Sequence, residues 1–409
     1  MKERWKSVCI KDVARVVNGG TPKTKVSDYW GGHHLWITPA EMGRLVSPYL
    51  HESKRKLTDA GLQNCSASLV PAHSVILSTR APIGHLVINS VPMAFNQGCR
   101  GLVPSEKILY KYLYYFLGFS VDLLNDLGSG TTFKELSAGK LKSVEIPLPS
   151  LPEQKRIVAI LDEAFAGIDT AIANTEKNLA NARELFESYL NSVFTQGGDR
   201  WESSILGDVY DVRDGTHDSP KYQSSGRALV TSKNLKSGSL DLSNVKCISE
   251  EDYQSICRRS AVHKGDVLLA MIGTIGNPIV VENEPDYAIK NVALFKVPKD
   301  RSGHFLRYYL MSQETVKKMA REAKGTTQKF VGLGYLRNFP IQLPDNNQEQ
   351  LLVEAIAEYE GIARNLESIY QQKLTALAEL KQSLLQKAFS GQLTADAADA
   401  VETVEAELA

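Results

Sequence analysis

Two polar segments of the same type lie 195 residues apart in this 409-residue sequence. The first is Gly130-Thr131-Thr132 followed by Lys134, and the second is Gly325-Thr326-Thr327 followed by Gln328 and Lys329. Each combines a flexible turn, hydroxyl groups and a cation, and this mixture suits hydrogen bonds to phosphates and to base edges in a DNA groove. Both segments are therefore candidate nucleic-acid contacts.

Other polar positions recur in the same way. Gly19-Gly20-Thr21-Pro22-Lys23 is matched by Gly215-Thr216-His217, and Thr79-Arg80 is matched by Met271-Ile272. The last pair differs in chemistry, because the guanidinium of Arg80 can bond guanine bidentately and Ile272 cannot. The alternative is that these are tight turns whose Gly and Thr residues serve backbone geometry alone. The candidate DNA-binding residues are Thr21, Lys23, Arg80, Gly130, Thr131, Thr132, Lys134, Thr216, His217, Lys233, Asn234, Thr326, Thr327, Gln328 and Lys329.

Motifs for catalysis are weak by comparison. Phe330-Val331-Gly332-Leu333-Gly334 fits the F-x-G-x-G pattern for S-adenosylmethionine, but it precedes no strand–turn–helix unit and predicts a turn. No phosphate-binding G-x-x-x-x-G-K-[ST] loop and no aromatic-ended N/D-P-P motif occur. His33-His34 lack partners at a metal-like spacing, which favours a surface loop. We therefore expect no catalytic, cofactor-binding or metal-binding residues, and binding is favoured over catalysis.

The composition is that of an ordinary soluble protein, with 43% hydrophobic and 23% charged residues. The N-terminus has no secretory pattern, and no apolar run approaches the length of a membrane span. The five cysteines include no C-x-x-C pair, and their odd number suits a reducing compartment. These features predict a cytoplasmic protein.

The net charge of zero is a sum over unlike segments. Residues 1–150 carry 18 Lys and Arg against 11 Asp and Glu, and residues 200–345 carry 21 against 17. The segments that follow them, 151–199 and 346–409, carry 4 against 8 and 4 against 11. A basic body with an acidic tail, present twice, indicates bodies that face phosphates.

The repetition extends well beyond the polar motifs. Trp5 recurs as Trp201 at an offset of 196, and Val75-Ile76-Leu77 recurs as Val267-Leu268-Leu269 at an offset of 192. A period this long indicates a duplicated domain, because solenoid repeats span only about 20–50 residues. We expect globular domains at 1–150 and 200–345, long helices at 151–199 and 346–393, and a frayed acidic tail at 394–409.

Each globular part is predicted to end in a long helix. Ser150 and Glu153 form a capping box, and apolar residues then follow at steps of three or four from Ile157 to Val193. Asn346-Asn347-Gln348-Glu349 forms a second capping box, with an apolar seam from Leu352 to Ala388 that includes Tyr359, Ile362 and Leu380. Because one seam on a long helix cannot be satisfied alone in water, we expect the two helices to pair antiparallel.

The globular parts read as mixed α and β. Short apolar runs at 75–77, 86–88, 267–269 and 279–281 lie between turn signals, as strands do. Residues 110–119 and 305–319 predict short aromatic-rich helices. The predicted fold class is α+β, with two similar domains separated by a pair of long antiparallel coiled-coil helices, in a pseudo-two-fold internal duplication.

This organisation resembles the specificity subunit of Type I restriction–modification systems over essentially the whole chain. The resemblance rests on Leu148-Pro149 leading into Leu151-Pro152-Glu153-Gln154 and Ile157, with a weaker echo in Leu343-Pro344 and Gln348-Glu349-Gln350. Asn346-Asn347 departs from the family pattern, in which L-P stands before the second E-Q.

The resemblance implies two target-recognition domains, each reading one half of a bipartite double-stranded DNA target. It implies that the helices hold two modification subunits, which bind S-adenosylmethionine and methylate adenine at N6, and that two restriction subunits join some complexes. This chain would then be non-catalytic and would carry no cofactor itself. Two alternatives remain at this stage: a coiled-coil scaffold joining two carbohydrate- or protein-binding domains, and a degenerate methyltransferase that uses the Phe330 motif.

Overall fold

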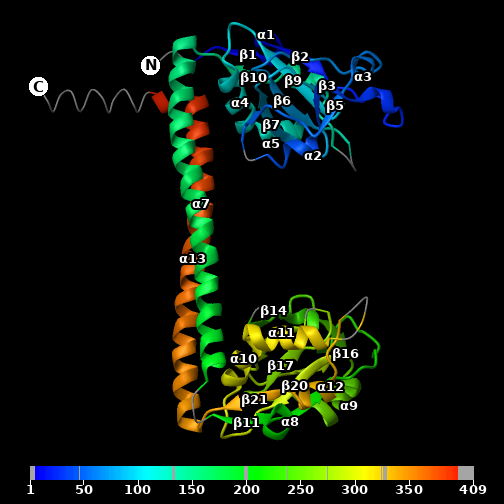
Figure 1. Ribbon diagram of the computed structural model, residues 1–409, viewed down its shortest axis with the longest axis vertical. Helices are drawn as coiled ribbons and strands as arrows, with labels where there is room; N and C mark the ends of the chain where they lie inside the picture. Colours follow the sequence, from blue (N-terminus) through cyan, green and yellow to red (C-terminus); the bar gives the residue numbers. More distant parts are fainter. Residues whose placement is uncertain are drawn as a thin grey trace, which may run out of the picture. The chain divides into compact units, whose positions relative to one another are not determined.

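The computed structural model describes residues 5–45, 47–130, 134–197, 201–236, 238–273, 275–323, 325 and 329–394 (Figure 1). The chain forms two compact units, one of Met1–Asn174 with Lys373–Ala409 and the other of Thr175–Gln372. Two long helices, α7 (Leu151–Gln196) and α13 (Asn346–Ser390), contribute a segment to each unit. Each unit therefore contains one mixed α/β domain and a two-helix segment.

The central sheet of the first unit is built around an apolar run that the sequence marks as a strand. This strand, β6 (Val75–Thr79), is buried along its whole length and is the middle one of five in the order β2-β9-β6-β7-β4. Neighbours are antiparallel, except that β4 and β7 are parallel. The other four strands are β2 (Ala14–Asn18), β9 (Cys99–Pro104), β7 (Ile83–Asn89) and β4 (Tyr49–Leu50).

Smaller elements complete the first domain. A three-stranded sheet has the order β5-β3-β8, and β1 pairs antiparallel with β10. These strands are β5 (Arg55–Leu57), β3 (Trp30–Ile37), β8 (Ala94–Phe95), β1 (Ser7–Cys9) and β10 (Glu145–Pro147). The short helices are α1 (Ile10–Val13), η1 (Ser27–Tyr29), α2 (Pro39–Met42), α3 (Asp59–Gln63), α5 (Val121–Leu127) and α6 (Ala138–Lys142).

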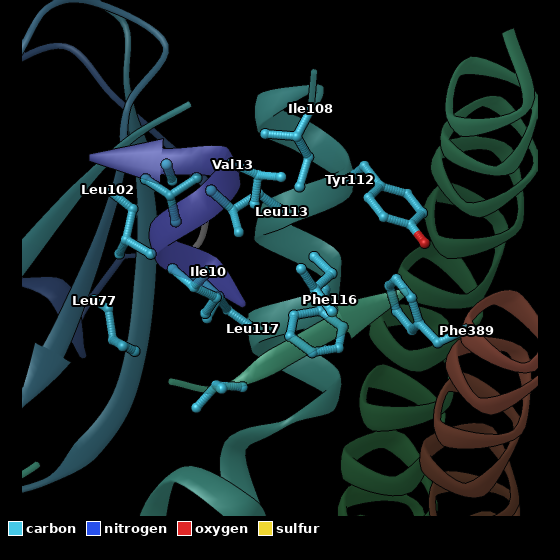
Figure 2. Close-up of a cluster of buried hydrophobic side chains, with 14 of the residues drawn as sticks. Ile10, Val13, Leu77, Leu102, Ile108, Tyr112, Leu113, Phe116, Leu117 and Phe389 are labelled. Atoms are coloured by element: carbon cyan, nitrogen blue, oxygen red, sulfur yellow. The ribbon is translucent and has the colours of Figure 1, made fainter. Parts of the chain in front are cut away.

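The aromatic helix α4 (Tyr110–Phe119) joins the first domain to its two-helix segment. Figure 2 shows Tyr112 and Phe116 of α4 beside Phe389 of α13, with ring centroids 5.3 and 5.4 Å from that phenyl ring. Leu113 and Leu117 are completely buried in the same cluster. This helix therefore shares one apolar core with the sheet and with α13.

The second domain repeats the strand order of the first. Its central sheet has the order β12-β20-β17-β18, which corresponds to β2-β9-β6-β7, and a second sheet has the order β16-β13-β19, which corresponds to β5-β3-β8. The first sheet consists of β12 (Asp211–Asp214), β20 (Val292–Lys296), β17 (Val267–Ala270) and β18 (Gly276–Val280). The predicted duplication is thus visible in strand order and direction.

The second domain contains further strands and helices. The strands are β16 (Lys246–Ile248), β13 (Arg227–Thr231), β19 (Tyr287–Lys290), β14 (Leu235–Lys236), β15 (Ser239–Leu240) and the antiparallel pair β11 (Glu202–Ile205) and β21 (Pro340–Leu343). The helices are α8 (Leu206–Val209), η2 (Ser232–Asn234), α9 (Glu250–Ser260), α10 (Gly303–Met311), α11 (Gln313–Glu322) and α12 (Leu333–Arg337).

One predicted helix is in fact two. The aromatic-rich stretch 305–319 is broken at Ser312, whose backbone is extended between α10 and α11. Ser312 Oγ lies 2.8 Å from Tyr309 O and 3.0 Å from Thr315 Oγ1, so its side chain supplies hydrogen bonds at the break. In the first domain Ser120, with φ −90° and ψ 9°, separates α4 from α5.

The long helices pair antiparallel within each unit, as predicted. In the first unit Glu153 and Asp169 of α7 contact Thr394 and Lys381, so contacts later in α7 meet residues earlier in the second helix region. In the second unit Arg183 Nε lies 2.9 Å from Glu367 Oε2, and the rings of Tyr189 and Tyr359 stack with centroids 4.0 Å apart. The predicted α7 seam, from Ile157 to Val193, is buried or half-buried throughout.

The predicted seam of α13 needs correction. Ile362 and Leu380 are 49% and 46% exposed, whereas Ala363 and Leu385 are buried. Arg307 Nη2 of α10 lies 2.7 Å from Glu360 Oε1. Glu360 and Ala363, three residues apart, lie on the same face of α13.

The start of α13 also differs from the predicted capping box. Asp345, not Asn346, accepts the hydrogen bond from Gln348 N, at 2.9 Å. Glu349 does not reach back to the cap, because its carboxylate is buried against Arg301 and Ser302.

None of the described helices has both the length and the apolar composition that a membrane span requires.

Candidate nucleic-acid interface

The candidate contacts of the first domain lie on four loops at one edge of its central sheet. These loops follow β2, precede β9, join β6 to β7 and precede α6, and the antiparallel order of the strands brings the first three to the same edge. Thr79 N donates to Gly98 O at 2.8 Å, and Thr79 O accepts from Leu136 N at 2.9 Å. The end of β6 therefore holds the β9 loop on one side and the segment before α6 on the other.

Arg80 and the 130–134 loop lie together at this edge. Arg80 is exposed and forms a β-bridge with Glu135. Glu135 also exchanges two backbone hydrogen bonds with Ser129, at 2.9 and 3.0 Å, and these close the loop that carries Gly130 and the exposed Lys134. Gly130 has a φ of +117°, a conformation that favours glycine. Thr131 and Thr132 lie outside the described residues.

Thr21 lies in the loop after β2 and contacts the loop before β9. Its hydroxyl donates a hydrogen bond to the side-chain carbonyl of Gln97, and Gly20 N donates to Phe95 O at 2.9 Å. Lys23 is exposed, and its backbone carbonyl accepts from Trp30 Nε1 at 3.4 Å. Gln97 was not among the predicted residues, because its contact with Thr21 spans 76 residues and leaves no local sequence pattern.

Arg100 is a second residue that the sequence did not single out. Its Nη1 donates to Gln97 O and to Cys99 O, both at 2.9 Å, and its Nη2 lies 3.9 Å from Glu135 Oε1. The guanidinium thus lies between the β9 loop and the base of the 130–134 loop. We assign Arg100 a positioning role at this edge.

The second domain has an equivalent contact built from different side chains. Thr216 N donates to Ile289 O, as Gly20 N does to Phe95 O, which makes His217 the counterpart of Thr21. His217 Nδ1 lies 2.7 Å from Asn291 Oδ1, and its Nε2 lies 2.9 Å from Asp214 Oδ2. The exposed imidazole is therefore held on both sides.

The carboxylate beneath His217 is itself neutralised. Asp214 is 4% exposed, and its other oxygen lies 2.6 Å from Arg259 Nη2. A buried carboxylate that is paired in this way fixes the orientation of the side chain above it. Thr216 Oγ1 accepts from Asp218 N at 3.1 Å, which shapes the same loop.

Lys329 lies where the structural repeat predicts it. Gly273 N donates to Lys329 O at 2.9 Å, and Ile272 bridges Phe330 as Arg80 bridges Glu135. Lys329 is exposed. Gly332 serves as the N-cap of the five-residue α12, in agreement with a turn. Thr326, Thr327 and Gln328 lie outside the described residues.

The neighbouring residues Lys233 and Asn234 have different environments. Lys233 is exposed in η2. Asn234 is only 8% exposed, its Oδ1 accepts from Thr231 N at 2.9 Å, and its Nδ2 donates to Asp241 O at 3.0 Å. The structure therefore gives Asn234 a capping role and does not support it as a base contact.

In each domain, the loops at one edge of the central sheet carry the candidate contacts. Together they offer hydroxyl, amide, imidazole, guanidinium and ammonium groups on a fixed scaffold, which suits contacts to phosphates and base edges. The comparison with known families agrees with this chemistry. The sequence model of the Type I restriction modification DNA specificity domain matches residues 2–181 and again residues 198–375. This chain belongs to that family.

Related specificity subunits match along most of the chain. The Type I restriction enzyme MjaIX specificity subunit of Methanocaldococcus jannaschii is 27% identical over 95% of this chain and 93% of its own length. The EcoBI specificity subunit of Escherichia coli is 25% identical over 75% of this chain and 70% of its own length.

Solved structures share the fold of this chain. A chain from a study of complex assembly and conformational transition in the type I R-M system matches with a TM-score of 0.78 at 18% identity, over 96% of this chain and 99% of that one. The HsdS subunit from Thermoanaerobacter tengcongensis matches with a TM-score of 0.59 at 17% identity, over 96% and 98%.

Proposed function

We propose that this chain is the sequence-reading, non-catalytic subunit of a Type I restriction–modification complex. Each α/β domain reads one half of a bipartite double-stranded DNA target through its loop edge. The observation that carries this proposal is the matched contact Thr21·Gln97 and His217·Asn291, in which one scaffold position holds two different polar pairs. Two readers of different half-sites need such an arrangement.

Arg80 also supports the proposal that the two domains read different half-sites. It occupies the position of Ile272 at the end of the equivalent strand, so only the first domain presents a guanidinium there. A guanidinium can bond guanine O6 and N7 together, whereas an isoleucine offers only apolar contact. Lys134 and Lys329, on loops of both domains, are candidates for phosphate contacts that position each domain without selecting a base.

Partner subunits account for a feature that DNA reading leaves unexplained. Leu351, Ile362 and Ile369 of α13 are 66%, 49% and 47% exposed. Steps of 11 and 7 residues return to the same face of an α-helix, so these side chains form one apolar stripe beside the seam. We assign this stripe to contact with modification subunits, two per chain, which would supply S-adenosylmethionine and methylate adenine at N6 in the cytoplasm. Two restriction subunits would join complexes that also cleave.

The proposal is tested by measuring methyl transfer to DNA from labelled S-adenosylmethionine. The chain is purified alone and in complex with the modification subunit of the same system. We expect transfer only from the complex, and no stoichiometric binding of S-adenosylmethionine by the isolated chain in calorimetry. Micromolar binding by the isolated chain that is lost in Gly332→Ala would contradict the proposal and support a methyltransferase.

A further inference from the structure

Two adjacent histidines in the first domain lie with their rings close together. His33 and His34 belong to β3, not to a surface loop as the sequence suggested. Successive side chains of a regular strand alternate between faces. Here the register shifts between Trp30 and His34, and Gly31 has a φ of +81°. This bulge brings the two imidazole rings to a centroid distance of 4.0 Å.

A carboxylate from another element completes a group of three. Asp59, the first residue of α3, places its Oδ1 2.7 Å from His34 Nε2 and 3.7 Å from His33 Nε2. One ligand atom from each residue lies within 4.8 Å of the others. The side chains of His33 and Asp59 are each 71% exposed, and that of His34 is 16% exposed. An ion from solvent can therefore reach all three.

We propose that His33, His34 and Asp59 bind one divalent transition-metal ion, with Zn²⁺ as the best match. Two imidazoles and one carboxylate form a ligand set that Zn²⁺ uses, with solvent free to fill a fourth position. Metal–ligand distances of about 2.0–2.1 Å require donor atoms about 3.3 Å apart in a tetrahedral site. The distances from Asp59 Oδ1 to His34 Nε2 and to His33 Nε2, 2.7 and 3.7 Å, lie on either side of that value.

The ion would join β3 to α3 and so brace the segment between Lys23 and Trp30. Trp30 Nε1 donates to Lys23 O at 3.4 Å, and Thr58 Oγ1 donates to Asp28 O at 2.6 Å. Thr58 also caps α3 through Gly61 N. Metal binding would therefore stabilise the segment that begins at Lys23, a candidate DNA contact, without touching DNA itself.

Calorimetric titration of the full-length chain with ZnCl₂ tests this proposal, with Co²⁺ absorption as a second readout. We expect one ion per chain and a ligand-field band for Co²⁺. His33→Ala and Asp59→Asn, both at exposed side chains, should weaken binding at least tenfold and abolish that band. His51→Ala removes an exposed histidine outside the cluster and should bind as the unchanged chain does.

Thermal unfolding supplies the third readout. Zn²⁺ should raise the midpoint of the unchanged chain and of His51→Ala, but not that of Asp59→Asn, because only folded protein with an intact site binds the ion. Circular dichroism of Asp59→Asn without metal checks that the variant is folded. Equal Zn²⁺ affinity in all variants, or no binding by the unchanged chain, would overturn the site. Either result would leave the DNA-reading proposal untouched.

Discussion

Gln154 and Glu349 occupy the same position in the two repeats, five residues after Pro149 and Pro344. Both are buried at the start of a long helix, with 0% and 2% exposure. The side-chain amide of Gln154 both accepts and donates hydrogen bonds. Its Oε1 accepts from Leu109 N at 2.9 Å, and its Nε2 donates to carbonyl oxygens including Pro149 O at 3.0 Å. An amide can do both because it is a donor and an acceptor.

In the second repeat, two residues, Glu349 and Arg301, make the equivalent hydrogen bonds. Glu349 Oε1 accepts from Ser302 N at 2.6 Å, but an ionised carboxylate cannot donate to a carbonyl. Arg301 supplies the missing donor, with Nη1 2.9 Å from Glu349 Oε2 and 3.0 Å from Pro344 O. The second repeat therefore replaces one neutral amide with a buried ion pair.

Gln154→Glu should destabilise the first unit strongly. The new carboxylate would face the carbonyls of Lys107 and Pro149, which Gln154 Nε2 now satisfies. An uncompensated buried charge costs about 3–5 kcal/mol. Urea unfolding of the full chain measures this cost, with Gln382→Glu, at an exposed position of α13, as the control. Equal midpoints for the two variants would show that the buried hydrogen bonds of Gln154 do not stabilise the first unit.

Stability should fall in acid because of Glu360. Burial alone would raise the pKa of this carboxyl, but the hydrogen bonds and charge of Arg307, with help from Tyr308 and Arg364, lower its pKa from 4.5 to about 2. A folded-state pKa below the unfolded value gives stability that is present above about pH 4.5 and is lost as the pH falls towards 2.

Glu360→Gln should remove part of this acid sensitivity. It should also cost about 3 kcal/mol at pH 7, because Arg307 would remain buried without its partner. Unfolding curves between pH 7 and pH 2.5 measure both effects, with the exposed neighbour in Glu358→Gln as the control. If the stability of Glu360→Gln fell with pH in parallel with that of the unchanged chain, Glu360 would not be the source of the acid sensitivity.

Arg80→Ala should relax one base position in one half-site. Loss of a bidentate guanine contact costs about 1–3 kcal/mol of discrimination. Methylation-site profiling of the assembled complex measures the change. Arg15→Ala is the matched control, since Arg15 is exposed at the opposite end of β2 from the candidate loops. An unchanged first half-site, or an altered second one, would remove Arg80 from the readout.

Lys329→Ala should weaken binding to all DNA sequences alike. A phosphate contact carries no base information, and its loss should lower the salt-dependence slope by about one unit. Binding by the assembled complex at several salt concentrations measures that slope. Lys299→Ala is the control, because Lys299 is exposed beyond the other end of β20. A base-specific change in Lys329→Ala would reassign the residue to direct readout.

His217→Ala should alter the second half-site only. The imidazole is exposed, is oriented by Asp214 and Asn291, and matches Thr21 of the first domain. Methylation-site profiling should show one relaxed base and an unchanged first half-site. His263→Ala, at an exposed histidine before β17, should leave both halves intact. Changes in both halves of the His217→Ala profile would contradict independent reading by the two domains.

The sequence predicted the features that depend on local periodicity. The spacing of apolar residues predicted the heptad seam of α7 and the strand at Val75, and the structure confirmed both. The α13 seam was misplaced at Ile362: Ala363 is buried instead, on the same face as Glu360, which pairs with Arg307 at a distance of 53 residues in the sequence. Such long-range pairing leaves no periodic signal.

The candidate site was predicted less completely, for the same reason. Repetition pointed to Arg80 and Lys329 as candidates. Gln97 and Asn291 were missed, because their contacts with Thr21 and His217 join residues 76 and 74 positions apart in the sequence. The contact of His34 with Asp59 spans 25 residues and needs a strand bulge, which spacing alone does not reveal. The second E-Q echo was aligned one residue out of register, since Glu349, not Gln350, takes the place of Gln154.

Sequencing the adenine methylome of the host with and without the gene for this chain tests most directly whether the chain directs adenine methylation to a two-part DNA target. We predict that one bipartite motif, two short defined sequences separated by a fixed spacer, is methylated in the parent and unmethylated in the deletion strain. An identical adenine methylome in both strains of a host that expresses the complex would contradict this role of the chain.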